Sequence, residues 1–185
     1  MHIIQTSIPG VLIVEPKRLG DERGFFTELF QARRYSENAI GGIFVQDNLS
    51  RSARGVLRGL HLQNPNPQGK LVTVLRGAVL DVAVDVRLGS PTFRRHVSVE
   101  LSEDNRRQLW VPRGFAHGFI VRSESADLYY KCDEYYSPPD EIVIRWDDPE
   151  LCIDWEEQSP QLSARDLNGQ MLRNASAVLP HYGAL

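Results

Sequence analysis

The feature that most constrains this chain is a regular succession of short apolar segments separated by turn residues. Segments rich in Val, Ile, Leu and Phe recur at intervals of roughly ten residues, with Gly, Pro, Asn or Asp between them. Short strands at this spacing are typical of an all-β sandwich or barrel. The expected strands are 3–4, 10–14, 25–30, 44–50, two within 71–86 around Arg76-Gly77, 97–101, 109–111, 119–121, 128–131 and 142–146.

The chain is long enough to bury one sizeable core. It has 185 residues, of which 42% are hydrophobic, and a domain of this size removes most of its apolar surface from water on folding. No repeat, low-complexity run or linker divides it, so we expect a single domain over residues 1–185. Residues 32–38 are expected to form a short helix. The stretch from Asp147 onward is expected to be irregular and to wrap the barrel surface.

The charge balance gives no general attraction to nucleic acid or to an anionic membrane. The chain has 21 basic and 24 acidic residues and a net charge of -3, so any phosphate that it binds must meet a local site. No apolar run approaches the roughly 20 residues that span a bilayer, and residues 1–16 lack a secretory pattern. We therefore expect a cytoplasmic protein. Cys132 and Cys152 have neither metal-ligand nor disulfide spacing and are expected to be reduced, with at least one buried.

A histidine and a lysine stand near each other around the sequence Arg-Gly-Leu-His-Leu-Gln at 58–63. A connection rich in proline and glycine separates His61 from Lys70, so we expect the two side chains to be neighbours across a hairpin. Such a pair is suited to removing a proton next to a carbonyl and to holding the charge that develops on its oxygen. Taken alone, the two residues are more simply a half-buried histidine and a solvated lysine, and only their combination favours catalysis.

A second histidine motif, Val-Pro-Arg-Gly-Phe-Ala-His-Gly-Phe at 111–119, places His117 after a tight turn. With His61 it resembles the two motifs of the cupin jelly roll, Gly-x-His-x-His with a distant Glu and Pro-x-Gly-x-x-His. Cupins commonly hold a metal with three histidines and a glutamate. Here Gln63 replaces the second histidine and the glutamate position falls in a Gly/Pro/Lys stretch. Two imidazoles and an amide make a poor metal site, so we expect this fold without a metal.

Two further groups extend the acid–base set. Residues 128–138 contain four tyrosines, and a tyrosine on a concave β face can act as a general acid or stack on a base. An aromatic belt is the simpler interpretation of Tyr129 and Tyr136. Asp166 ends the sequence Leu-Ser-Ala-Arg-Asp at 162–166, where an aspartate is usually a turn or cap residue. Paired with His61, it would fix the imidazole tautomer and stabilise the imidazolium.

Eight segments, in order and over nearly the whole chain, resemble the dTDP-4-dehydrorhamnose 3,5-epimerase family. They are 21–26, 44–48, 56–61, 68–72, 81–85, 112–118, 130–131 and 135–138. The resemblance implies an all-β, cupin-type double-stranded β-helix (jelly roll) with a few short helices and an irregular C-terminal segment. It implies an isomerase that uses no cofactor and acts on a dTDP-linked 4-keto-6-deoxy sugar. It also implies a homodimer whose N-terminal strands, about residues 1–30, are exchanged between subunits.

The same resemblance implies roles for individual residues. His61 would be the base, Asp166 its partner, Tyr130 the acid on the opposite face of the sugar and Lys70 the group that stabilises the enolate. Tyr135 would stack on the thymine. The other residues implied in binding the nucleotide and sugar are Arg23, Phe26, Glu28, Gln46, Asp47, Asn48, Arg58, His117, Glu141 and Arg165. The chain departs from the family at Arg165, where lysine is more common, and at 168–171.

The chemistry of a 4-keto sugar supports these roles independently of the resemblance. The protons at C3 and C5 both lie next to the carbonyl, so inversion of either carbon needs a base on one face, an acid on the other and a stabilised enolate. His61, Tyr130 and Lys70 supply one group for each requirement.

Three arginines, Arg23, Arg58 and Arg165, are candidate ligands of the diphosphate because a guanidinium can pair with two phosphate oxygens. A solvated surface arginine is the alternative for each, above all for Arg165. Two other functions stay open at this point. One is a single-site epimerase or a 3,4-ketoisomerase acting on a related dTDP-4-keto-6-deoxy sugar, and the other is a non-catalytic or metal-dependent cupin. The complete acid–base set favours the double epimerase.

Overall fold

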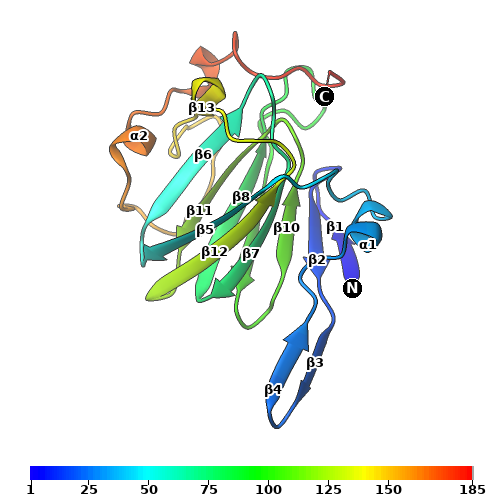
Figure 1. The fold of residues 1–185 in the computed structure, drawn as a ribbon. Coiled ribbons are helices and arrows are strands. Elements are labelled where there is room, and N and C mark those ends of the chain that lie inside the picture. Colours follow the sequence, from blue (N-terminus) through cyan, green and yellow to red (C-terminus); the bar gives the residue numbers. More distant parts are fainter. Residues whose placement is uncertain (185) are drawn as a thin grey trace.

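The computed structural model describes residues 1–184 as two facing β-sheets with a projecting hairpin (Figure 1). The six-stranded sheet contains, in spatial order, β1 (His2–Gln5), β2 (Leu12–Glu15), β10 (Gln108–Val111), β7 (Lys70–Arg76), β12 (Ser125–Cys132) and β5 (Gln46–Ala53). The five-stranded sheet contains β13 (Glu141–Val143), β6 (Leu57–Gln63), β11 (Phe115–Val121), β8 (Ala78–Asp85) and β9 (His96–Ser102). The hairpin pairs β3 (Arg18–Asp21) with β4 (Gly24–Thr27). The helices are α1 (Ala32–Ser36), α2 (Ala164–Leu167) and the 3₁₀ turns η1 (Pro138–Asp140) and η2 (Leu172–Asn174).

The path of the chain is that of a double-stranded β-helix. Between β5 and β13, successive strands lie in opposite sheets, except that β8 and β9 pair directly within one sheet. The strand pairs of both sheets are antiparallel. The expected all-β, cupin-type jelly roll with a few short helices is therefore confirmed.

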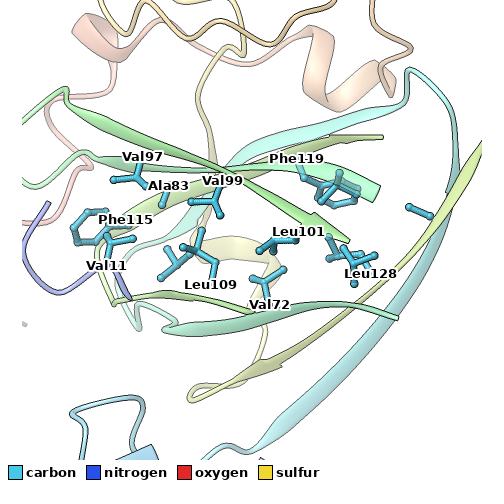
Figure 2. Close-up of a cluster of buried hydrophobic side chains, with 14 of the residues drawn as sticks. Val11, Val72, Ala83, Val97, Val99, Leu101, Leu109, Phe115, Phe119 and Leu128 are labelled. Carbon is cyan, nitrogen blue, oxygen red and sulfur yellow. The ribbon is translucent and has the colours of Figure 1, made fainter. Parts of the chain in front are cut away.

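The main core lies between the two sheets. Figure 2 shows Val72 and Leu128 of the six-stranded sheet facing Ala83 and Phe119 of the five-stranded sheet. Cores of this kind are close-packed, so truncating a fully buried side chain such as Leu101 to alanine would cost about 2–5 kcal/mol.

The outer face of the five-stranded sheet is covered by the C-terminal segment. Leu151, Trp155, Leu172 and Leu179 belong to one buried cluster with Val82 of β8. Because both of its faces are covered, β8 is buried along almost its whole length and lacks the alternation of a half-exposed strand. The expected wrapping of the barrel by the residues after Asp147 is confirmed.

Some predicted boundaries were wrong. The strand predicted over 25–30 ends at Thr27, because Phe30 leaves the hairpin and packs against Tyr35 and Phe44. The predicted segments 44–50, 119–121, 142–146 and 32–38 correspond to β5, β11, β13 and α1 with the bounds given above. The amide-rich β5 is the edge strand of the six-stranded sheet.

The β3–β4 hairpin extends away from the two sheets (Figure 1). Leu19, Phe25 and Phe26 are exposed on it, Phe26 to 68%. Large apolar side chains gathered on one projecting hairpin mark a surface suited to a protein contact.

Both cysteines are free thiols, as expected. Cys132 is buried and Cys152 is exposed. Within residues 1–184, no helix has the length and apolar character needed to cross a membrane.

Candidate active site

A cavity of about 330 Å³ opens between the two sheets. β5, β7 and β12 form one wall and β6, β11 and β13 form the facing wall. A concave site with several convergent polar and titratable groups is where a small ligand is expected to bind. The predicted site residues that line it are Gln46, Asn48, Arg58, His61, Lys70, His117, Tyr130, Glu141 and Arg165.

Two glycines allow β6 and β11 to approach closely beside this cavity. A Cβ atom on Gly59, whose φ is +140°, would lie 2.6 Å from Cα of Gly118. Only glycine tolerates both this backbone angle and this contact. Both glycines lie on the same side of the point where His61 and His117 stand opposite each other in the strand register.

His61 and Asp166 form the predicted pair. Nε2 of His61 lies 2.5 Å from Oδ1 of Asp166. Ser163 caps α2, accepts from the backbone N–H of Asp166 and donates its hydroxyl to Oδ2 at 2.7 Å. Burial opposes ionisation of Asp166, but the hydrogen bonds from His61 and Ser163 outweigh it and hold the pKa of this carboxyl below its usual value. Because Nε2 binds Asp166, Nδ1 is the ring nitrogen left to accept a proton from a ligand.

Lys70 begins β7 on the opposite wall of the cavity. The predicted hairpin between His61 and Lys70 is wrong, because β6 and β7 belong to different sheets and the connection between them crosses the barrel. Both side chains nevertheless line the same cavity. Burial lowers the pKa of Lys70, and its ammonium group has no hydrogen-bond partner among the described residues. A cation in that condition is available to an oxyanion.

Asp133 fixes the start of β7. Its Oδ1 accepts the backbone N–H of Gly69 at 2.6 Å, and its Oδ2 accepts from Nε of Arg113 at 3.1 Å. A Cβ on Gly69 would lie 2.4 Å from the Trp110 ring. The position of Lys70 therefore depends on a tightly packed backbone rather than on contacts of its own ammonium group.

Tyr130 stands on the same wall as Lys70 and faces the wall that carries His61. It lies in β12, opposite Val72 of β7 and Asn48 of β5. Burial raises the pKa of its hydroxyl, so the group keeps its proton at neutral pH. The cavity thus has a proton acceptor on one wall and a proton donor on the other.

His117 forms a second histidine–aspartate pair. Its Nε2 lies 2.8 Å from Oδ1 of Asp81 in β8. His117 is 7% exposed and Asp81 is completely buried. The sequence predicted His117 as a substrate ligand but did not predict Asp81 as its partner.

Two predicted phosphate ligands differ in their surroundings. Nε of Arg58 donates to Oγ of Ser52 at 3.0 Å, and Arg58 has no carboxylate partner among the described residues. Arg165 instead forms an ion pair with Glu141, whose other oxygen accepts from the Tyr136 hydroxyl at 2.7 Å. An anion can therefore reach Arg58 directly but must compete with Glu141 for Arg165.

The remaining predicted ligands do not line this cavity: Arg23, Phe26, Glu28, Asp47 and Tyr135. Arg23 and Phe26 belong to the β3–β4 hairpin and its turn, where the Arg23 side chain pairs with that of Asp21. The Glu28 carboxylate pairs with Arg34 just beyond the hairpin, at 2.7 Å. These three residues lie on the N-terminal segment that the sequence predicted to be exchanged between subunits.

Asp47 and Tyr135 lie beside the cavity but are directed elsewhere. The Asp47 carboxylate accepts from Nζ of Lys131 at 2.7 Å and from the Tyr129 hydroxyl at 3.0 Å. Its neighbours Gln46 and Asn48 line the cavity, so Asp47 points to the opposite face of β5. Tyr135 is 65% exposed, on a loop that Gln63 holds by a hydrogen bond to the Tyr135 carbonyl.

The lining residues that were not predicted include Gln68, Cys132 and Tyr136. Cys132 stands two residues after Tyr130 on β12, so strand periodicity places both on one face and could have identified it. Burial raises the pKa of the Cys132 thiol to about 11, which keeps the thiol neutral beside Lys70. Tyr136 was interpreted as part of an aromatic belt, yet its hydroxyl binds Glu141 at the cavity.

The donor set of the cavity does not fit a metal ion. His61 and His117 each bind a carboxylate through Nε2. Gln63, which stands where cupins have their second histidine, uses its amide to hold backbone groups of two neighbouring loops. No three His, Cys, Asp or Glu side chains in residues 1–184 are grouped so that they could hold a metal.

The fold and these side chains define a cupin-type protein with a candidate acid–base site. A family model described as dTDP-4-dehydrorhamnose 3,5-epimerase matches residues 5–174. The chain therefore belongs to the dTDP-4-dehydrorhamnose 3,5-epimerase family.

Individual relatives agree with this membership. A protein of that name from Shigella flexneri is 53% identical over 178 residues, which cover 95% of this chain and 98% of the relative. The crystal structure of dTDP-6-deoxy-D-glucose-3,5-epimerase from Legionella pneumophila in complex with dTDP-4-keto-L-rhamnose has a TM-score of 0.96 and 55% identity over 99% of each chain. A dTDP-4-dehydrorhamnose 3-epimerase from Streptomyces niveus is 40% identical over 187 residues, covering 98% of this chain and 90% of the relative.

Proposed function

We propose that this protein is a cofactor-independent isomerase that inverts C3 and C5 of dTDP-4-dehydro-6-deoxy-D-glucose to give dTDP-4-dehydro-L-rhamnose. The family membership, and the Legionella relative whose crystal structure contains dTDP-4-keto-L-rhamnose, support this substrate. The observation that carries the proposal is the arrangement of three groups in one cavity. His61, Tyr130 and Lys70 lie on facing walls, with the base on one wall and the acid and the cation on the other.

The mechanism follows from these positions. Nδ1 of His61 removes the proton from the carbon next to the C4 ketone, and the electron pair of that C–H bond moves into the enolate. The Lys70 ammonium stabilises the enolate oxygen, which is worth about 3 kcal/mol for a well-placed donor. Tyr130 then delivers a proton to the same carbon from the opposite face, which inverts it, and solvent restores both protonation states. The same steps at the second carbon complete the reaction.

Binding of the nucleotide is proposed to use the rim of the cavity. Arg58 and Arg165 would pair with the diphosphate, and Gln46, Asn48 and Glu141 would hydrogen-bond the sugar or the nucleoside. Arg165 would exchange Glu141 for phosphate as the ligand enters. The exposed ring of Tyr135 would stack on the thymine.

We further propose that the active unit is a homodimer. The β3–β4 hairpin, with the exposed side chains of Leu19, Phe25 and Phe26, supports an exchange of N-terminal strands between subunits. In such a dimer, Arg23 and Glu28 would reach the partner's cavity. Sedimentation of an active enzyme as a dimer is expected, and a fully active monomer would contradict the exchange.

The cytoplasm is the proposed place of action. The two cysteines are unpaired with each other, and reduced thiols of this kind persist in the cytoplasm. Fractionation of cells that express the full-length protein tests this location.

The reaction is tested by incubating the protein with dTDP-4-dehydro-6-deoxy-D-glucose in deuterated water and following the sugar by NMR. We expect deuterium at both C3 and C5 and inversion of both carbons. Inversion at one carbon, or formation of a 3-keto isomer, would instead support a single-site epimerase or a 3,4-ketoisomerase. The double epimerase is preferred because relatives named 3,5-epimerase reach 55% identity, whereas the relative named 3-epimerase is 40% identical.

A further inference from the structure

The two histidine–aspartate pairs of the cavity differ in how the carboxylate is satisfied. The Asp166 carboxylate accepts hydrogen bonds from His61 at one oxygen and from the Ser163 hydroxyl at the other. The Asp81 carboxylate accepts one, from His117. Its second oxygen is buried and has no hydrogen-bond partner among the described residues.

The surroundings of Asp81 do not supply another counter-charge at contact distance. Asp81 lies in register with Phe119 of β11 and Val99 of β9, both members of the apolar core between the sheets. Lys70 attracts it through space, but the two side chains form no ion pair, and Lys70 is shared with Glu141. An ionised carboxylate beside a neutral imidazole would therefore place one uncompensated negative charge in the core, which is strongly unfavourable.

We propose that Asp81 is a positioning residue that keeps the His117–Asp81 pair electrically neutral, so that His117 presents an Nδ1–H donor to the sugar nucleotide. Two placements of the protons satisfy this condition. In one, His117 is an imidazolium beside an ionised Asp81. In the other, a protonated Asp81 donates to Nε2 of a neutral ring. Because Nε2 faces Asp81 in both, Nδ1 carries a proton in both and donates to an oxygen of the bound ligand.

This assignment extends the proposed function and rests on it for the identity of the ligand. The oxygen that His117 would meet is a phosphate or carbonyl oxygen, since both accept hydrogen bonds in the ground state. His61 has the opposite task. Asp166 has other donors and stays ionised without a second proton on His61, so the His61 ring can be neutral and accept the substrate proton.

The protonation of the two rings can be read directly from the ¹⁵N NMR spectrum of the full-length protein at neutral pH. The chain has five histidines, so spectra of His61→Gln and His117→Gln assign the two signals. We expect Nδ1 of His117 to carry a proton and Nδ1 of His61 to be unprotonated. An unprotonated Nδ1 of His117 would overturn the proposal. The measurement needs no turnover, so its result is independent of whether the double-epimerase proposal holds.

Two variants of Asp81 test whether the proton donor matters for binding. Asp81→Leu removes both oxygens at similar volume but leaves Nε2 of His117 without its partner, so the variant should be less stable than the wild type. Circular dichroism checks that it is folded, and KM for the sugar nucleotide should rise roughly tenfold to a hundredfold with a smaller change in kcat. Asp81→Asn should recover most of this loss, because its amide N–H can donate to Nε2 and leave Nδ1–H in place. An unchanged KM in Asp81→Leu, or equal losses in the two variants, would overturn the proposal.

The matched control is Asp85→Asn. Asp85 is a completely buried carboxylate on the same strand, but its partners are Arg87, Ser90 and Thr92, away from the cavity. Asp85→Asn should lower the thermal unfolding midpoint and leave KM unchanged. An equal rise of KM in this control would show that the effect of Asp81→Leu is merely structural and would also overturn the proposal.

Discussion

The cavity holds two histidine–aspartate pairs that share residue types and differ in everything around the carboxylate. His61 and His117 stand opposite each other on adjacent strands, and each binds its aspartate through Nε2. Asp166 sits at a capped helix end with several donors, whereas Asp81 sits in an apolar core with one. The number of other donors to the carboxylate decides whether the imidazole is free to lose its proton. The same dyad can thus serve as a base or as a fixed donor.

The largest expected effect comes from breaking the His61 pair. His61→Asn should reduce deuterium exchange at both C3 and C5 by about 10⁴-fold, because the proposed Nδ1–H of His117 leaves the cavity no other imidazole nitrogen to act as the base. NMR in deuterated water measures this loss, with circular dichroism as the check on folding. His117→Asn is the matched control and should retain measurable exchange at both carbons. Near-native exchange in His61→Asn would move the base elsewhere, with His117 the first candidate.

The next effect separates proton removal from proton delivery. Tyr130→Phe leaves His61 and Lys70 in place, so the enolate can still form and deuterium should enter at C3 or C5 with retained configuration. Doubly inverted product should fall by about 10²–10⁴-fold, the contribution of one proton-transfer group. The measurement combines deuterium incorporation with a coupled reductase assay. Normal inversion of both carbons would reduce Tyr130 to a structural or stacking residue.

A comparable effect is expected for Asp166→Asn. The amide N–H can donate to Nε2 of His61, which places the ring proton on Nδ1 and removes the charge that stabilises the imidazolium, so exchange and inversion should slow together by about 10²–10⁴-fold. The comparison with Tyr130→Phe is the control, because that variant is expected to separate the two rates. A variant in which inversion alone slows would show that Asp166 does not act through the base.

The strand pattern of the fold could be predicted from the sequence, but the pairing of strands could not. Alternating apolar residues and turn signals located nearly every strand. The sequence after His61 predicts a hairpin, although a proline-rich segment of that length fits a crossing of the barrel equally well. Strand β7 pairs with β10 and β12, which are far from it in the sequence, and this pairing shows that the connection crosses the barrel. Long-range pairing of this kind leaves no local signal.

Site residues could be predicted where residue type and motif are sufficient. The prediction failed where a role depends on the direction in which a side chain points from its strand. His61 and Lys70 were predicted from their residue types and motif, and Tyr130 was predicted from the family resemblance. Asp47 was grouped with its neighbours, but on a strand a shift of one residue points the side chain to the other face. Asp81 could not be recognised, because an aspartate alternating with valines does not reveal which side chain across the sheet it binds.

A third buried carboxylate sharpens the comparison through the pH dependence of stability. Asp85 is on the same strand as Asp81, and burial opposes its ionisation, but hydrogen bonds from Arg87, Ser90 and Thr92 prevail and lower its pKa. A lowered pKa in the folded state gives stability that is present above the unfolded pKa of about 3.9 and is lost as the pH falls through the folded value. Urea unfolding between about pH 6 and pH 3 should therefore show a steeper loss in the wild type than in Asp85→Asn. Equal slopes would mean that Asp85 is not ionised in the folded protein.

The smallest expected effect, no change at all, concerns metal chelation. In a metal-dependent cupin, His61 and His117 would be joint ligands of one ion, and the difference between their two pairs would have no catalytic meaning. Here each Nε2 is bound to a carboxylate and the Gln63 amide holds two loops, so a metal would have to displace three sets of hydrogen bonds to find its ligands. We expect purified protein to contain no stoichiometric transition metal and EDTA to leave the rate of inversion unchanged. One Zn or Fe per chain, together with activity that is lost on chelation and restored by that metal, would contradict both the acid–base mechanism and the division of roles between the two pairs.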